Sequence, residues 1–205
     1  MSLMKNALKG LAVAAALTAT GVTAQAQEVT LKLHQFLPAQ ANVPKFVIDP
    51  WIERVQEASG GKIKIDHYPS MQLGGTPPDL IGQVQDGVAD ITWTVLGYTP
   101  GRYPTTEVFE LPFMVEDPRA ASCAYSIMFD EHMAKGEFKD LKILGTWVHG
   151  PGAFHTNKPV EKPADLKGMK IRGGSRLVNE LLKLTGATPV GMPVPSVPQA
   201  LSKGV

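Results

Sequence analysis

The chain has 205 residues and a formal net charge of +1 at pH 7, and 43% of its residues are hydrophobic against 19% charged. This composition excludes a disordered chain, and the near-neutral charge argues against nucleic-acid binding, which needs a basic surface. The 20 glycines and 17 prolines predict many turns. Cys123 is the single cysteine, so no internal disulfide can form.

Residues 1–26 have the pattern of a secretory signal peptide. Lys5 and Lys9 are their only charges, an apolar run covers 10–22, and Ala24-Gln25-Ala26 fits the small-x-small site of a signal peptidase. The apolar run is shorter than the roughly 20 residues that span a bilayer. We therefore predict cleavage near Ala26 and export of a protein that is not embedded in the membrane.

The first half of the exported chain alternates predicted strands and helices. Period-two hydrophobic patterns predict strands, and spacings of three and four predict the helices between them. That order implies parallel strands joined by right-handed crossovers, an α/β lobe. Ligands bind beyond the carboxyl ends of such strands. The predicted strands are 29–36, 62–68 and 88–96, and the helices are 48–58 and 76–87.

The second half continues with a helix, a strand and then a break. The helix over 120–131 carries Cys123 on its apolar face, which predicts a buried thiol, and a strand is predicted over 141–149. Gly150-Pro151-Gly152 follows, so we place a lobe boundary there, with residues 27–149 in lobe I and 150–205 in lobe II. Lobe II is predicted to begin another α/β unit, with strands over 169–172 and 188–190.

Arg172 is the strongest candidate for ligand binding. It closes a predicted strand, and Ser175 begins the next helix three residues later. A guanidinium there lies beside the free N–H groups of a helix start, and both favour an anion. A bidentate pair with a carboxylate would also fix the ligand's orientation. From spacing alone, an exposed arginine at a strand end is the other interpretation.

Five further residues are candidates for ligand contact: Trp93, Tyr98, His34, Gly173 and Met192. Trp93 can equally be part of the sheet core. Tyr98 can stack on a ligand or cover the core. His34 can donate to a ligand or be a capped or surface histidine, and Gly173 lets the chain turn tightly.

Enzyme signatures are absent from the sequence. It has no Gly-x-Ser-x-Gly, His-Glu-x-x-His, phosphate-binding loop or dinucleotide-binding glycine motif, and its five histidines lack metal-ligand spacing. We therefore predict no catalytic residue, no metal and no cofactor.

Several segments together point to one family. They are Trp51-x-x-x-Val55-x-x-Ala58-Ser59-Gly60-Gly61, Tyr68-Pro69-Ser70-x-Gln72-Leu73-Gly74, Asp86-Gly87-x-x-Asp90-Ile91, Leu111-Pro112-Phe113, Asp165-Leu166-Lys167-Gly168-Met169-Lys170-Ile171-Arg172, Gly186-Ala187-x-Pro189 and Ala200-Leu201-x-x-Gly204-Val205. Over residues 29–205 the chain resembles the solute-binding proteins of tripartite ATP-independent periplasmic (TRAP) transporters.

The resemblance implies a periplasmic-binding-protein-like, two-lobed (Venus flytrap) α/β fold that closes on a ligand. It implies a periplasmic protein that delivers a small organic acid to the membrane permease subunits of a TRAP transporter, with Arg172 as the carboxylate clamp. A ligand-sensing component for a receptor kinase would have the same fold. A secreted α/β hydrolase is the third alternative, but we find no nucleophile and base for it.

Two departures from the family pattern affect these expectations. Sialic-acid-binding members carry a second arginine where this chain has Gly152, which disfavours sialic acid, and residues 93–104 resemble a subgroup that takes smaller hydroxy or aromatic acids. Family members also continue beyond the segment that ends at Val205. We therefore expect a C-terminally truncated chain with an incomplete second lobe, in which these 205 residues alone bind ligand weakly or not at all.

Overall fold

The computed structural model describes residues 28–205, so the predicted signal peptide and its cleavage site near Ala26 lie outside the described residues. The strands are β1 (Val29–Gln35), β2 (Ile63–Tyr68), β3 (Ile91–Trp93), β4 (Lys170–Gly173) and β5 (Thr188–Gly191). The α-helices are α2 (Asp49–Ala58), α3 (Leu80–Gln85), α4 (Pro118–Met128), α5 (Arg176–Leu184) and α6 (Val197–Ser202). Shorter helical turns cover Pro44–Ile48, Pro77–Asp79, Leu96–Tyr98, Pro104–Glu110, Phe129–Met133, Pro163–Leu166 and Val194–Ser196.

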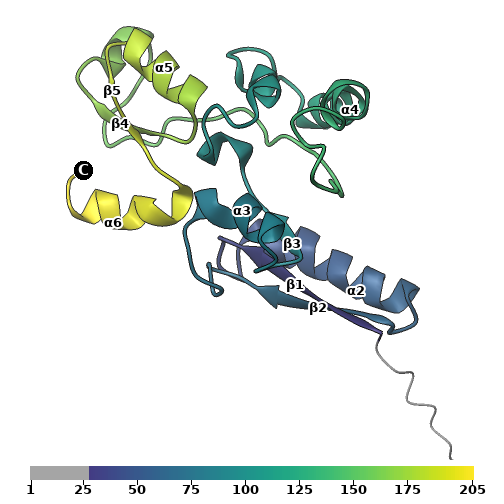
Figure 1. The fold of residues 1–205 in the computed structure, drawn as a ribbon. Coiled ribbons are helices and arrows are strands. Elements are labelled where there is room, and N and C mark those ends of the chain that lie inside the picture. The colour runs from purple at the N-terminus through teal and green to yellow at the C-terminus, as the bar shows by residue number, and fades with distance from the viewer. Residues whose placement is uncertain (1–27) are drawn as a thin grey trace, which may run out of the picture.

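The N-terminal unit consists of β1, β2 and β3 with α2 and α3 (Figure 1). Its strands lie in the order β2-β1-β3, and both pairs are parallel, as the alternation of strands and helices predicts. The apolar face of β1 and β2 packs against α2 and the turn before it, and burying these side chains is the main favourable term in folding the unit. The buried residues of this core are Leu33, Ile48, Ile52 and Ile65.

The C-terminal unit consists of β4, β5 and α5. The two strands pair in parallel, Arg172 opposite Val190, and α5 crosses between them. Ser175 caps α5 by accepting a hydrogen bond from the Val178 amide, at 3.4 Å. The core of the unit contains Leu166, Leu182 and Ala187.

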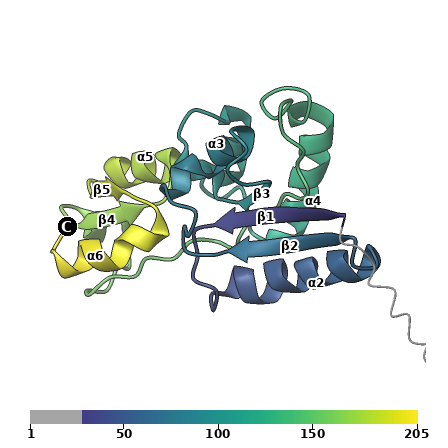
Figure 2. The same cartoon turned by 60° about the horizontal axis from the view of Figure 1, so that its bottom comes forward.

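The two units give the chain the two-lobed α/β architecture that the resemblance implies, while the boundary at residue 149 stays a prediction. Figure 2 shows that the arrowheads of β1 and β2 point toward the side where β4, β5 and α6 lie. The carboxyl edge of the first sheet therefore faces the C-terminal unit. In open α/β sheets, this edge is where ligands bind.

A cluster of aromatic residues holds the segment between the units. Tyr103 and Phe138 stack with ring centroids 4.5 Å apart, and Phe109 and Tyr125 lie 4.6 Å apart. Burial, and to a smaller extent the carboxylates of Glu137 and Glu110, raises the pKa of Tyr125 to about 12. This packing fixes the turn over Pro104–Glu110, which borders the site described below.

Three sequence predictions are wrong in detail. Residues 141–149 form no strand: among the described residues no other strand pairs with this segment, and the Val148 amide donates instead to the Ser122 hydroxyl at 3.1 Å. The strand predicted over 88–96 is shortened to β3 because the chain turns helically at Leu96–Tyr98. Cys123 is exposed, since α4 buries Tyr125 instead.

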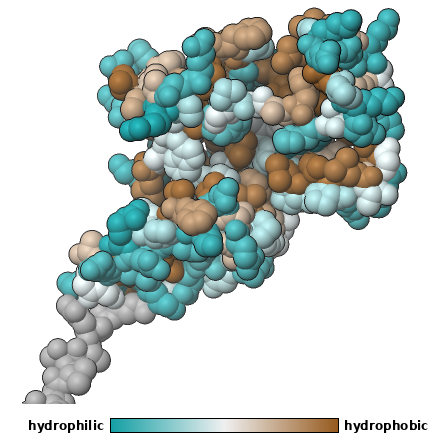
Figure 3. All heavy atoms as spheres, turned by 180° about the vertical axis from the view of Figure 1, so that it is seen from behind, coloured by the Kyte–Doolittle hydropathy of each residue, from teal (hydrophilic) through white to brown (hydrophobic). Residues whose placement is uncertain are grey.

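Apolar side chains remain exposed along the unpaired segment that follows α4. Leu144, Trp147 and Phe154 are each about half exposed or more. Figure 3 shows further hydrophobic patches on the rear face of the molecule, in its upper part. No helix within residues 28–205 is long and apolar enough to cross a membrane.

Candidate functional site

A cavity of about 190 Å³ lies where the N-terminal segment 97–100 meets the C-terminal unit. Three of the six residues predicted from the sequence line it, namely Tyr98, Gly173 and Met192. The remaining lining residues are Gly97, Pro100, Gly174, Ser175, Asn179, Gly191 and Pro193. The cavity therefore sits at strand ends of both sheets, as predicted for a ligand site in this class of fold.

Arg172 lies beside this cavity and has an unused donor. Its Nε donates to the backbone carbonyl of Met192 at 2.8 Å, which fixes the guanidinium, whereas its Nη2 is buried without a hydrogen-bond partner. The guanidinium packs on Gly174, where a Cβ would approach Nη1 to 3.1 Å. A buried, unpaired cationic donor is costly, and a carboxylate would satisfy it. This geometry favours the anion-binding interpretation of Arg172 over the exposed-arginine one.

Asn179 is a second polar group at the cavity, and sequence reasoning missed it. Its Oδ1 is buried without a partner. The side chain fits only because Gly173 has no Cβ, which would lie 1.9 Å from that oxygen. The sequence does contain a signal, because Asn179 stands three residues before Leu182 and so shares the inward face of the helix. A polar side chain on that face is expected to have a hydrogen-bond partner.

Tyr98 connects the two units, whereas Trp93 belongs to the core. The Tyr98 hydroxyl accepts a hydrogen bond from the Val194 amide at 3.1 Å, next to Pro193 of the cavity lining. Phe36 stacks on Trp93 at 5.1 Å and tilts against Tyr98 at 5.4 Å. Trp93 also packs against the N-terminal core and does not line the cavity, so the structure supports the core interpretation for this residue.

The structure places His34, predicted as a ligand donor or as a capped or surface histidine, among buried protein groups. His34 is fully buried, with Nδ1 2.7 Å from Gln83 Oε1 and Nε2 accepting from the Leu73 amide at 3.3 Å. Gln83 donates its amide group to Gly74, so its Oε1 accepts and His34 carries its proton on Nδ1. Both ring nitrogens therefore form hydrogen bonds with other parts of the protein. This is possible because the loop after β2 folds over the end of β1.

An ion pair joins the first residue of α5 to the turn over Pro104–Glu110. The Arg176 guanidinium forms a bidentate pair with the Glu107 carboxylate, in which Nε donates to Oε1 at 3.2 Å and Nη2 donates to Oε2. These hydrogen bonds lower the pKa of the Glu107 carboxyl below its ordinary value, against the smaller opposing effect of burial. Nearby, a Cβ on Gly97 would lie 2.7 Å from Ser175 Cβ, so the backbones meet closely.

The Glu107–Arg176 pair predicts a small pH dependence of stability. Because the folded pKa of Glu107 is depressed, the pair stabilises the fold above the ordinary glutamate pKa of about 4.3, and this contribution is lost as the pH falls through the folded pKa. Since Arg176 is half exposed and solvent screens the pair, we expect this contribution to the free energy of unfolding to be small. In urea unfolding, the difference between the parent chain and Glu107→Gln should shrink as the pH falls from about 5 to about 3. A difference in the free energy of unfolding between the two proteins that stays constant over this pH range would contradict the assignment.

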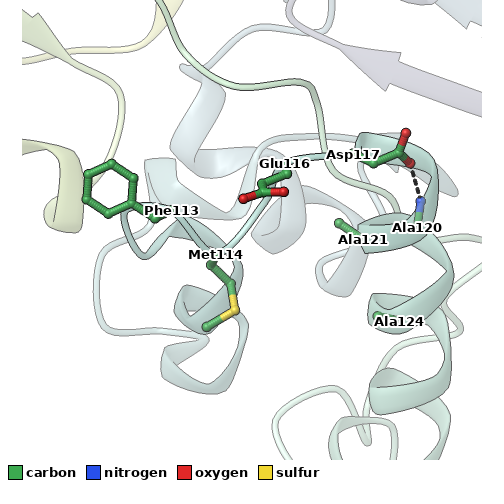
Figure 4. A pocket seen from close by; sticks show the side chains of 7 residues that line it. All are labelled: Phe113, Met114, Glu116, Asp117, Ala120, Ala121 and Ala124. Atoms are coloured by element: carbon green, nitrogen blue, oxygen red, sulfur yellow. Dashed lines mark hydrogen bonds between the residues drawn. The ribbon is translucent and has the colours of Figure 1, made fainter.

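A second hollow, of about 430 Å³, lies on the surface beside α4 (Figure 4). Phe113 and Met114 border it, and Phe113 is 98% exposed. Its charged lining residues are Glu116 and Asp117, and Asp117 caps α4 by accepting from the Ala120 amide at 2.7 Å. Two carboxylates without a lining cation disfavour an organic anion. The smaller cavity beside Arg172 is therefore the candidate site.

Comparison with known proteins shows the family of this chain. The family model of the bacterial extracellular solute-binding proteins, family 7, matches residues 34–205. A curated relative, the outer membrane transporter protein TsaT of Comamonas testosteroni, is 28% identical over 190 residues, which are 92% of this chain and 56% of that protein.

Two solved structures are more similar in sequence. A marine metagenome TRAP solute-binding protein specific for aromatic acid ligands, in complex with 3-hydroxybenzoate, is 52% identical with a TM-score of 0.84, over 87% of this chain and 56% of that one. A TRAP solute-binding protein from Rhodoferax ferrireducens T118, in complex with copurified benzoate, is 51% identical with a TM-score of 0.83, over 86% and 55%.

The chain thus spans about half the length of the relatives that it matches. Within that half, the family model matches residues 34–205, and the solved structure shares the fold over 87% of this chain. The chain belongs to the bacterial extracellular solute-binding proteins of family 7, the family that includes the solute-binding proteins of TRAP transporters.

Proposed function

We propose that this protein binds a small aromatic carboxylate between its two units in the periplasm and delivers it to the membrane subunits of a TRAP transporter. The observation that carries the proposal is the buried Nη2 of Arg172, which lacks a partner beside the cavity. Aromatic acids are favoured because the two solved proteins that are about half identical to this chain hold 3-hydroxybenzoate and benzoate.

In this proposal each residue at the cavity has a separate task. Arg172, held in place by the Met192 carbonyl, pairs with the carboxylate of the ligand. Tyr98 offers its ring to the ligand while its hydroxyl holds the Val194 amide. Closing the two units around the ligand excludes water, which strengthens the ion pair. The predicted signal peptide, with cleavage near Ala26, would export the protein to the compartment where this delivery occurs.

A matched pair of ligands tests the charge requirement. Benzoate and benzamide have nearly the same shape, but only benzoate is an anion. In a thermal-shift titration of the full-length protein, as its gene encodes it, benzoate should raise the melting temperature, with a stabilisation of about 2.7 kcal/mol at 100 times Kd. Benzamide should not. Equal shifts for the two compounds, or no shift for a panel of aromatic acids, would contradict the proposal.

A further inference from the structure

Glu110 has a buried carboxylate oxygen next to Gly97, one of the residues that line the candidate site, and the proposed contacts do not use it. It ends the helical turn over Pro104–Glu110, and its Oε2 is buried without a hydrogen-bond partner. Its Oε1 lies 3.0 Å from the position that a Cβ on Gly97 would take. That same position is 2.7 Å from Ser175 Cβ and 3.5 Å from the Gly174 carbonyl. The Glu110 carboxylate therefore lies next to the place where Gly97 meets Gly174 and Ser175, three residues of the cavity lining.

Glu110 forms no ion pair among residues 28–205. Arg176 is close enough for Glu110 to add to the rise in its pKa, but the larger cause of that rise is the hydrogen bond with Glu107, which takes up the guanidinium. Arg172 forms no ion pair with any carboxylate among residues 28–205. Glu110 Oε2 is thus an acceptor without a hydrogen bond, next to the site that is proposed to bind an anion.

The unpartnered buried atoms define the chemistry that a ligand must bring. Within the described residues they are one donor, Arg172 Nη2, and two acceptors, Glu110 Oε2 and Asn179 Oδ1. A carboxylate oxygen on the ligand satisfies the donor, but only an O–H or N–H group satisfies the acceptors. An unsubstituted acid would leave Glu110 unpaired and would bring a second negative charge near it.

Resting on the proposed function, we propose that Glu110 is a specificity-determining residue that selects acids carrying a hydroxyl group. Its carboxylate accepts a hydrogen bond from the hydroxyl of the ligand while Arg172 holds the ligand's carboxylate at the other end. A site built to accept a hydrogen bond rejects the analogue that lacks the donor, because its own buried group stays unpaired. Asn179 offers a second acceptor to the same hydroxyl or to another one.

The test compares benzoate with 2-, 3- and 4-hydroxybenzoate by calorimetry on the full-length protein. At least one hydroxylated isomer should bind about 10- to 100-fold more tightly than benzoate, the range for a hydrogen bond to a charged group. In Glu110→Leu this preference should fall to about onefold. Benzoate itself should bind the variant as tightly as before, or more tightly, since the repulsion is removed. Glu110→Gln keeps the shape and a neutral acceptor, and should retain a reduced preference.

Glu116→Leu is the control, because Glu116 is an exposed carboxylate of the next loop and lies outside the candidate site. It should leave the preference unchanged. If Glu110→Leu unfolds, the Glu110→Gln variant still tests the role, because its preference for the hydroxylated isomer should be smaller than that of the parent protein. A parent protein that prefers no isomer over benzoate, or Glu110 variants that weaken all four ligands equally, would overturn the inference and leave the proposed function standing. A parent protein that binds none of the four acids would instead overturn the proposed function.

Discussion

Replacing Arg172 with alanine should abolish benzoate binding at practical concentrations. Truncating one member of a buried, hydrogen-bonded charge pair costs about 2–5 kcal/mol, which corresponds to a loss of affinity of roughly 30-fold to several thousand-fold. Much of this cost arises because the ligand carboxylate would enter the site without a partner. Calorimetry on the full-length protein and on Arg172→Ala measures the effect directly.

Two further variants show whether the loss reflects the guanidinium itself. Arg172→Lys keeps the charge but loses the planar fork and the Nε bond to Met192, so it should recover only part of the affinity. Arg119→Ala removes an exposed arginine from α4 and should leave the affinity unchanged. Wild-type affinity in Arg172→Ala would refute the assigned role.

The second large effect is expected at Leu182, which holds α5 on the C-terminal sheet. Leu182 is 1% exposed and packs with Leu166 and Ala187. Leu182→Ala should lower the free energy of unfolding by about 2–5 kcal/mol, because it loses buried apolar surface and leaves a cavity. Because α5 begins at the Ser175 cap and carries Asn179, ligand affinity should fall as well.

Leu184 provides a matched control within the same helix. It is 86% exposed, so Leu184→Ala should change the free energy of unfolding by less than about 0.5 kcal/mol. Urea denaturation of both variants measures the difference. Equal losses for the two leucines would show that α5 does not pack as the structure describes.

The sequence predicts the parts of the fold that depend on local pattern. Alternating apolar residues are enough to find β1 and β2, and the strand–helix order is enough to predict a parallel sheet. The position of Arg172 near the end of a strand and just before a helix is predictable for the same reason, because it is a local feature of the sequence. The segment over 141–149 has the same alternating pattern, but pairing requires a neighbouring strand, which a local pattern cannot supply.

The remaining features of the site depend on contacts between distant residues. His34 looks available in the sequence because nothing nearby indicates that Leu73 and Gln83 take both of its nitrogens. Glu110 is one of 19 acidic residues, and only its approach to Gly97 and Ser175 sets it apart. For Cys123 the sequence predicts burial although the residue is exposed, because an apolar stripe along a helix does not show which of its residues face the core.

The most direct test of the account is a crystal structure of the full-length protein grown with benzoate. The account predicts density for the carboxylate within hydrogen-bond distance of Arg172 Nη2, with the ring in the cavity that Tyr98 and Met192 line. A ligand bound elsewhere, with Arg172 paired to a protein carboxylate or turned into solvent, would contradict it.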